Sequence, residues 1–260
     1  MKVSVVLLSS VEAPEALSRW LLGYLRAIGV EEVELIRDPG DYSSVRQAYS
    51  GSDAVIVAGA AGNPNAVRVI AELLGLGVEV NEEALNYIRS YYSDALDVPE
   101  GLENLALTPE FSYVVPNERG PVPAFVAMGL TEDKIIAGLP SRPSEAVECF
   151  ERGVQDFIRE KTGKRFSATM TFHLACDRST ADALADELSK ELRGVFARFD
   201  LRFLGREGAP LTLTVYAGTA EELYDTIVAA EELLQKLAAQ RDIPVLGGGI
   251  SKQATEESIL

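Results

Sequence analysis

Histidine, cysteine and tryptophan are scarce in this 260-residue chain, which contains one His, two Cys and one Trp. The cysteines, Cys149 and Cys176, show no Cys-x-x-Cys or Cys/His spacing, so the sequence predicts neither a disulfide framework nor a dedicated zinc site. His173 falls at a polar position of an expected strand, and we interpret it as solvent-facing rather than catalytic. A Ser-His-Asp hydrolase is unsupported, because Ser9 and Ser10 lack a Gly-x-Ser-x-Gly context and a histidine close in sequence.

Positive charge is also in deficit. The chain has 24 Lys and Arg against 40 Asp and Glu, for a net charge of −16, and its pI is about 4.6. The negative electrostatic potential of such a chain disfavours binding to nucleic-acid backbones and to anionic membranes unless basic groups cluster. The densest basic stretch, residues 161–165 (KTGKR), is better explained as a helix end with its glycine stop. The sequence therefore predicts no nucleic-acid partner and no membrane partner.

Long hydrophobic runs are absent. No stretch approaches the roughly 18 apolar residues that span a bilayer. The N-terminal MKVSVVLLSS has too short an apolar run for a signal peptide, and we interpret it as a first strand. Because cysteine usage also favours a reducing compartment, we expect a cytoplasmic protein.

What the sequence does contain is a regular alternation of strand and helix patterns over its first 160 residues. Strands are expected at 2–8, 32–36, 54–58, 112–115, 124–128 and 134–138, and helices at 14–28, around 45–49, and at 65–74, 81–92 and 143–161. Residues 94–110 are expected to be irregular. Such alternation predicts a three-layer α/β sandwich with a mainly parallel sheet.

After Gly163 the pattern changes. The expected elements are a strictly alternating strand over 166–176, a helix capped at Ser179-Thr180 and ending near 192, strands at 195–203 and 211–216, and a helix from Thr219 to about 239. This βαββα order predicts a small α+β domain. We therefore expect a first domain over 1–163, a second over 164–245, and a flexible tail over 246–260.

The stretch after the third expected strand combines glycines with the start of a helix. Residues 59–67 (GAAGNPNAV) have the layout of a loop that holds a phosphate against a helix N-terminus. From Gly59 to Leu73, however, there is no Ser, Thr, Lys, Asp or His, and Glu72 is the only acidic residue. The composition leaves three roles open for this loop: chemistry, binding alone, or a scaffold.

A second helix start lies at residues 139–145 (LPSRPSE), with a proline in the first helical turn. Free backbone N–H groups and the hydroxyls of Ser141 and Ser144 are expected to face an anion there, with the Arg142 guanidinium as a bidentate phosphate contact. The alternative is structural: Ser144 caps the helix, and Glu145 is favourable near its positive end.

Several pieces of the first domain together resemble a known family. They are, in chain order, Asp41 after the second expected strand, GAAG (59–62), NEEAL (81–85), ALTPE (106–110), VPNERGPVPAF (115–125) and IIAGLPSRPSEAVECF (135–150). They resemble the molybdopterin-binding domain shared by the molybdenum-cofactor proteins MoaB and MogA and by the CinA competence-damage family. The CinA branch is the closer match, over about residues 2–160. Residues 164–245 resemble, in pattern and position, the KH-type module that follows this domain in CinA proteins.

The resemblance implies a site at the carboxyl ends of the strands for a small phosphorylated ligand, either molybdopterin or a nucleotide. The turn at 116–120 (PNERG) would border this cleft, although a rigid hairpin connection explains it equally well. Relatives are commonly dimers or trimers, so we expect a homo-oligomer. The implied ligand-binding residues are Ser9, Gly59, Ala60, Gly62, Asn63, Asn117, Ser141, Arg142, Ser144 and Glu145.

The chain departs from the family at its glycine loop. CinA proteins usually have Gly-Gly-x-Gly-Pro-Thr-x-Asp-Asp there, whereas Ala66 and Val67 stand at the two aspartate positions. In the family these aspartates are the expected acid/base or metal-organising groups, and neither Ala nor Val accepts a proton or binds a hard cation. The resemblance therefore implies a degenerate loop that is weakly active or inactive.

Three other hypotheses compete with simple binding. The CinA branch implies hydrolysis of a nucleotide diphosphate such as ADP-ribose, which here requires Asp41 and Glu12 to hold a divalent cation, Mg²⁺ or Co²⁺. The MoaB and MogA branch implies an activity related to molybdopterin nucleotidyl transfer. The other hypothesis is a non-catalytic assembly protein whose small domain mediates oligomerisation. Beyond that divalent cation, the residues predict no resident cofactor.

Overall fold

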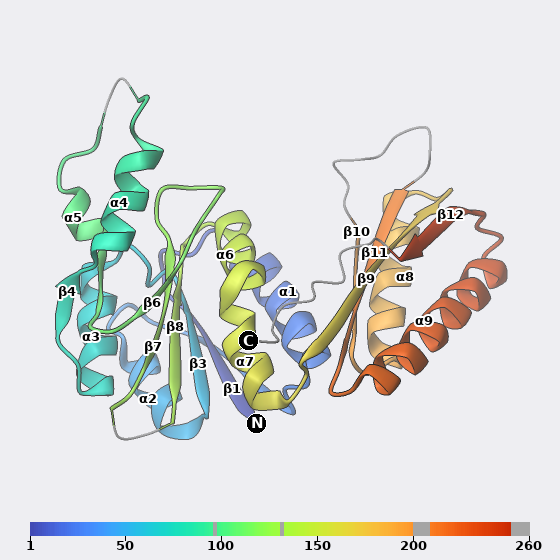
Figure 1. The fold of residues 1–260 in the computed structure, drawn as a ribbon, viewed down its shortest axis with the longest axis horizontal. Helices are drawn as coiled ribbons and strands as arrows, with labels where there is room; N and C mark the ends of the chain where they lie inside the picture. The colour runs from blue at the N-terminus through green and yellow to red at the C-terminus, as the bar shows by residue number, and fades with distance from the viewer. Residues whose placement is uncertain (96–97, 131–132, 200–208, 251–260) are drawn as a thin grey trace. The chain divides into compact units, whose positions relative to one another are not determined.

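The computed structural model describes residues 1–95, 98–130, 133–199 and 209–250. The chain forms two compact units, one made of Met1–Leu22 with Val30–Ile158 and the other of Gly23–Gly29 with the chain from Arg159 onward. The units thus divide at residues 158 and 159, close to the boundary expected at 163. Each unit has its own sheet, and we describe them separately (Figure 1).

The larger unit is built around a six-stranded sheet of order β2-β1-β3-β8-β7-β6. Strands β2, β1, β3 and β8 are parallel, and β7 and β6 continue the sheet antiparallel. The predicted mixed α/β fold with a mainly parallel sheet is therefore confirmed. The strands are β1 (Lys2–Leu7), β2 (Glu32–Arg37), β3 (Ala54–Ala58), β6 (Tyr113–Val115), β7 (Ala124–Met128) and β8 (Ile135–Leu139).

Helices follow most of these strands, close to where the sequence predicts them. They are α1 (Pro14–Ala27), α2 (Ser43–Gly51), α3 (Pro64–Leu74), α4 (Glu82–Tyr91), α5 (Leu102–Leu105), α6 (Pro143–Cys149) and α7 (Gln155–Thr162). A π-helical turn, η1 (Phe150–Val154), joins α6 to α7 within the one helix expected there. The strands β4 (Val78–Val80) and β5 (Leu107–Pro109) pair as a separate ribbon that the sequence did not predict. Their three residues each are too few for a hydrophobic period to be detected.

The sheet of the larger unit is covered on both faces. Every residue of β3 and of β8 is buried, which requires packed side chains above and below these central strands. On one face, residues of α2 and α3 form an apolar cluster with Val55, Val57 and Phe125. The Phe125 ring lies over Gly138, its partner on the neighbouring strand, where an added Cβ would overlap the ring.

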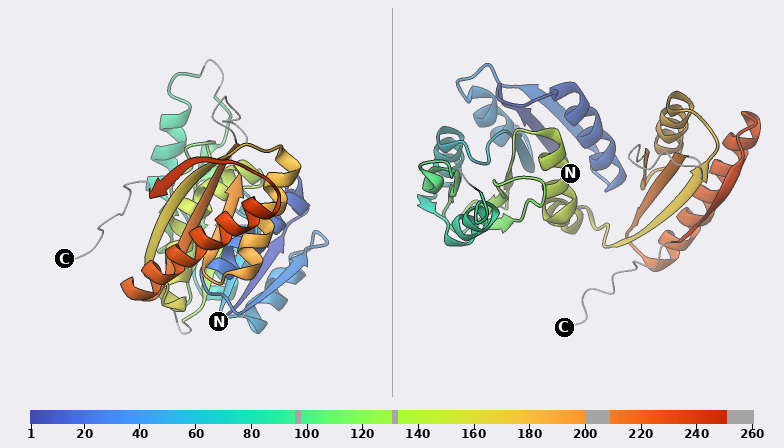
Figure 2. Two further views of the ribbon diagram at one scale, coloured as in Figure 1. Left: turned by 90° about the vertical axis from the view of Figure 1, so that its right-hand side faces the viewer. Right: turned by 90° about the horizontal axis from the view of Figure 1, so that it is seen from above.

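The smaller unit contains an antiparallel sheet of order β10-β11-β9-β12, with α8 and α9 packed on one face (Figure 2). The alternation predicted for its first strand is confirmed: Met170, Phe172 and Leu174 are buried in the core against these helices. Its elements are β9 (Phe166–Leu174), α8 (Arg178–Glu191), β10 (Val195–Phe199), β11 (Ala209–Ala217), α9 (Ala220–Gln240) and β12 (Val245–Ile250).

The structure corrects three expectations in the smaller unit. The predicted tail is a strand as far as Ile250, because β12 completes the sheet by pairing with β9, and residues 251–260 lie outside the described residues. Helix α8 is capped by Asp177, whose Oδ1 accepts a hydrogen bond of 2.8 Å from the N–H of Thr180. His173 is half-buried, and its buried Nδ1 has no hydrogen-bond partner among the described groups. The predicted Thr219 cap of α9 is confirmed.

The described helices also bear on the membrane question. None of them combines the length and the apolar character that a bilayer crossing requires.

Candidate functional site

Four loops meet at the carboxyl edge of the parallel strands, and we call residues 8–13, 38–42, 59–63 and 140–142 the carboxyl-edge loops. Parallel strands end at the same side of a sheet, so the loops that follow them are necessarily neighbours. Backbone hydrogen bonds join them directly: Glu12 N donates to Ser141 O at 3.1 Å, and Gly59 N donates to Leu139 O at 2.9 Å. The edge thus brings together most of the residues for which we predicted a ligand.

The glycines of the 59–63 loop allow the tight backbone turn that the sequence predicts. Gly59 and Gly62 have φ values of 86° and 73°, a left-handed conformation that side chains disfavour. A Cβ on Gly59 would also lie 2.6 Å from Ser10 Oγ, so the 8–13 and 59–63 loops pack closely. Ala60 is fully buried, so it presents no surface to a ligand in this structure, whereas Ser9 is exposed.

The amino terminus of α3 is already occupied by a side chain. Asn63 Oδ1 accepts hydrogen bonds of 3.2 Å from the backbone N–H groups of both Asn65 and Ala66. Pro64, at the first helical position, has no N–H to offer. Because Asn63 satisfies these donors, a phosphate at this helix start would have to displace it. Asn63 is therefore a helix cap in this structure.

The two positions where the family has aspartates face the protein interior. Ala66 is 1% exposed and Val67 is fully buried, and both belong to the apolar cluster that contains Ile70 and Phe125. Helix α3 thus packs with an apolar face where the family motif is acidic. This burial is consistent with the expected loss of the catalytic groups.

The two carboxylates proposed as catalytic have other partners. Asp41 Oδ1 accepts hydrogen bonds from Ser43 N at 3.0 Å and from Ser43 Oγ at 2.6 Å, which hold the pKa of Asp41 below its ordinary value. Glu12 Oε1 lies 3.5 Å from Arg142 Nε. Among the described residues, no group of three or more His, Cys, Asp or Glu side chains is placed to hold a metal ion.

The role of Asp41 can be tested by titration. Replacing Ser43 with alanine removes one of the two hydrogen bonds, so the pKa of Asp41 is expected to rise toward its ordinary value. Carboxyl carbon chemical shifts measured by NMR against pH report this directly, with Asp38 as an internal reference. An unchanged Asp41 titration in Ser43→Ala would contradict the assignment of Asp41 as a local structural group.

The sequence analysis missed Asp38, which organises the second carboxyl-edge loop. Its buried carboxylate accepts hydrogen bonds from the N–H groups of Gly40, Tyr42 and Ser44 at 2.8, 3.1 and 3.2 Å. Tyr42 has a left-handed φ of 61°, which these bonds help to hold. The turn sequence DPGD at 38–41 was the available signal, because aspartate before Pro-Gly commonly bonds to the following backbone.

The start of α6 differs from that of α3, because no side chain caps it. Arg142 occupies the N-cap position without a side-chain cap hydrogen bond, so the alternative in which Ser144 caps the helix is wrong. Ser144 is exposed, Ser141 is partly exposed, and the Arg142 side chain is 63% exposed. This helix start presents a guanidinium and two hydroxyl groups to solvent.

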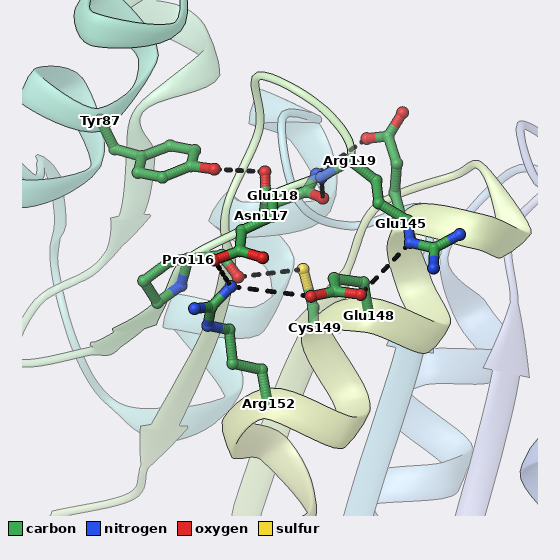
Figure 3. A network of polar contacts seen from close by, with 9 residues as sticks. All are labelled: Tyr87, Pro116, Asn117, Glu118, Arg119, Glu145, Glu148, Cys149 and Arg152. Carbon is green, nitrogen blue, oxygen red and sulfur yellow. Dashed lines mark hydrogen bonds and ion pairs between the residues drawn. The ribbon is translucent and has the colours of Figure 1, made fainter.

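Asn117 and Glu145 do not face a ligand but bind each other in the protein interior (Figure 3). Asn117 Nδ2 donates to Glu145 Oε2 at 2.9 Å and to Val122 O at 2.8 Å, and the two side chains come from residues that are 0% and 5% exposed. Gly120 packs so closely that an added Cβ would overlap the Glu145 carboxylate. These two side chains therefore fix the 116–120 turn to α6. The backbone N–H of Glu145, which we predicted to face an anion, donates to Arg142 O at 3.1 Å.

A wider polar network surrounds this pair. Arg119 Nε lies 3.2 Å from Glu148 Oε2, and Arg152 bridges Glu118 and Glu148 at 2.5 and 3.6 Å (Figure 3). The Tyr87 hydroxyl, from α4, donates to the carbonyl oxygen of the Asn117 residue.

Cys149, one of the two cysteines, packs beside the same network. Cys149 Sγ lies 3.8 Å from Pro116 O, and burial raises the pKa of its thiol to about 12 (Figure 3). Because the thiolate is the reactive form, Cys149 is an inert packing residue.

The fold and these loops define an α/β domain whose polar groups gather at one edge of a parallel sheet. No family model matches the chain. It is 27% identical over 236 residues to a protein of Pyrobaculum arsenaticum, covering 85% of this chain and 87% of that one. A putative competence-damage inducible protein of Caldanaerobacter subterraneus is 25% identical over 197 residues, which cover 74% of this chain and 46% of that relative.

Other curated relatives carry the same description, and the chain spans less than half the length of those it matches. Among solved structures, CinA of Thermoplasma acidophilum matches with a TM-score of 0.48 at 22% identity, over 60% of this chain and 97% of that one. Structures of MogA and MoaB match with lower TM-scores. These are the names that the sequence motifs predicted. The chain is thus similar to proteins described as competence-damage inducible or CinA-like.

Proposed function

We propose that the larger unit binds a small phosphorylated ligand, a pterin or a nucleotide, at its carboxyl-edge loops and that it lacks the family's catalytic step. The observation that supports binding most directly is the uncapped start of α6, where Arg142, Ser141 and Ser144 present a cation and two hydroxyl groups. An anion can accept hydrogen bonds from all three, and the helix dipole favours its charge.

The contrast between the two helix starts supports one position for the phosphate over the other. At α3 the donors are used by Asn63, whereas at α6 no side chain caps the helix, although Glu145 N already donates to Arg142 O. We therefore infer that the phosphate lies at the Ser141–Ser144 turn and that the rest of the ligand extends over the Gly59–Gly62 loop. The left-handed glycines give this loop its tight turn, and side chains of the protein, Ser10 at Gly59 and Val122 at Gly62, pack against them.

The absence of the family's catalytic step rests on separate observations. Ala66 and Val67 are buried apolar residues, and Asp41 and Glu12 are engaged by Ser43 and Arg142. Removing a positioned acid or base typically costs about 10²–10⁴-fold in rate. We therefore expect binding without appreciable turnover, with or without Mg²⁺ or Co²⁺.

Calorimetric titration with AMP, GTP, ADP-ribose and a molybdopterin precursor, each with and without Mg²⁺ or Co²⁺, tests the proposal. The variant Arg142→Ala is expected to weaken binding about 10-fold, because a charge-assisted hydrogen bond is lost. Arg46→Ala is the matched control, since Arg46 is also an exposed arginine paired with a glutamate, Glu72. Equal losses in both variants, or no binding of any ligand to the unmodified chain, would overturn the proposal.

A further inference from the structure

Two arginines at the carboxyl edge are both held by one acidic segment, residues 12–15 (EAPE). Arg142 Nε lies 3.5 Å from Glu12 Oε1, and Arg37, the last residue of β2, lies 2.6 Å from Glu15 Oε1. Arg142 also lies 3.5 Å from the Glu145 carboxylate, so two carboxylates share its guanidinium. Any anion that binds Arg142 therefore meets negative charge already in place.

The backbone of the acidic segment is held against the neighbouring loop. Glu12 N donates to Ser141 O at 3.1 Å, beside the residue whose side chain Glu12 pairs with. The next residue, Ala13, has a positive φ of 41°, a conformation that a non-glycine residue adopts at an energetic cost. The backbone contact between Glu12 and Ser141 therefore holds the Glu12 carboxylate close to Arg142.

The ion pair itself is open to exchange. Arg142 and Glu12 side chains are 63% and 62% exposed, and exposed pairs of this kind contribute little to folding stability. An incoming phosphate can replace the Glu12 carboxylate at the guanidinium without breaking any buried contact. The cost of binding then depends on how strongly Glu12 repels the ligand.

We propose that Glu12 is a specificity-determining residue that selects ligands by the charge of their phosphate group. This inference rests on the proposed function, because it assumes that the phosphate binds at Arg142. Coulombic repulsion grows with ligand charge. A terminal phosphate ester carries a charge of about −1.5 to −2 at pH 7 and a diester about −1, so Glu12 disfavours terminal phosphates more strongly.

AMP and 3′,5′-cyclic AMP form a matched pair of probes, since they share the nucleoside and differ in phosphate charge. In Glu12→Gln we expect calorimetry to show AMP binding about 3- to 5-fold tighter, as expected for removal of one exposed carboxylate, and cyclic AMP binding less than about 2-fold tighter. Glu72→Gln is the control, because it removes one charge from the exposed Arg46–Glu72 pair between α2 and α3 and leaves the carboxyl edge unchanged. Melting temperatures should be unchanged in both variants.

The outcomes separate this inference from the proposed function. If Arg142→Ala loses AMP binding but Glu12→Gln behaves like Glu72→Gln, the assignment of Glu12 is wrong and the binding site stands. Equal tightening for AMP and cyclic AMP would also overturn selection by charge, and weaker binding in Glu12→Gln would mean that Glu12 contacts the ligand. If neither nucleotide binds any variant, selection by Glu12 is overturned, whereas the binding proposal is decided by the wider set of ligands used to test it.

Discussion

Aspartate at position 67, where the family motif has one, is expected to destabilise this protein by about 3–5 kcal/mol. Val67 is fully buried in the apolar cluster of α3, so a carboxylate there has neither water nor a cationic partner. Urea unfolding at pH 7, monitored by circular dichroism, measures the loss. Part of it should be recovered as the pH is lowered, because protonation removes the buried charge.

Asn65→Asp is the matched control on the same helix. Asn65 is exposed in the first turn of α3, where a negative charge is favourable, and its replacement is expected to change stability by less than about 0.5 kcal/mol. A Val67→Asp variant that is as stable as the unmodified chain would show that α3 does not pack as described. If that variant also hydrolysed ADP-ribose, the family's catalytic site would be intact in all but these residues.

Asp in place of Asn117 is expected to destabilise the larger unit by about 2–4 kcal/mol at pH 7. The change keeps the shape of the side chain but replaces the NH₂ group that donates to Glu145 and to Val122 O with an acceptor. Two buried carboxylates then oppose each other at the 116–120 turn. Unfolding measured by urea at pH 7 and at pH 5 should show the variant closer to the unmodified protein at the lower pH.

Asn104→Asp is the control for this second prediction, since Asn104 is exposed on α5 and its side chain bonds to no buried carboxylate. It should leave stability within about 0.5 kcal/mol. Two results would argue against the Asn117–Glu145 pair as a structural element: equal effects of the two Asn→Asp changes, or a loss in Asn117→Asp that does not depend on pH.

These variants also separate two kinds of family motif in the chain. Two family motifs are present in this chain, the PNERG turn and the PSRPSE helix start. Asn117 and Gly120 of the turn contact Glu145 of the helix start in the protein interior, so the two motifs hold each other in place. The glycine loop keeps the backbone shape of Gly59 and Gly62 but carries apolar residues at the acidic positions. The chain therefore retains the motifs that shape the backbone but not the acidic residues of the glycine loop.

Most of the fold could be predicted because its signals are local. The strands β1, β3 and β8 are apolar runs bounded by turns, and helices such as α1 and α9 have long apolar stripes. The elements that were missed, β4, β5 and β12, are short or glycine-rich, and they become strands only because another strand pairs with them. A period of two cannot be recognised in VEV or in VLGGGI.

The sequence predicted which loops form the candidate site, but not which contacts their side chains make. The sequence by itself determined which loops follow parallel strands, that glycines shape the loop after β3, and that two aspartates are missing, since these depend on residue type and order. Only the tertiary structure decided what each polar side chain does. Asn63 caps a helix, and Asn117 and Glu145 form a buried pair. A hydrogen-bonding group bonds to whichever partner folding brings within about 3 Å. Glu12 reaches Arg142 for the same reason, across 130 residues of chain.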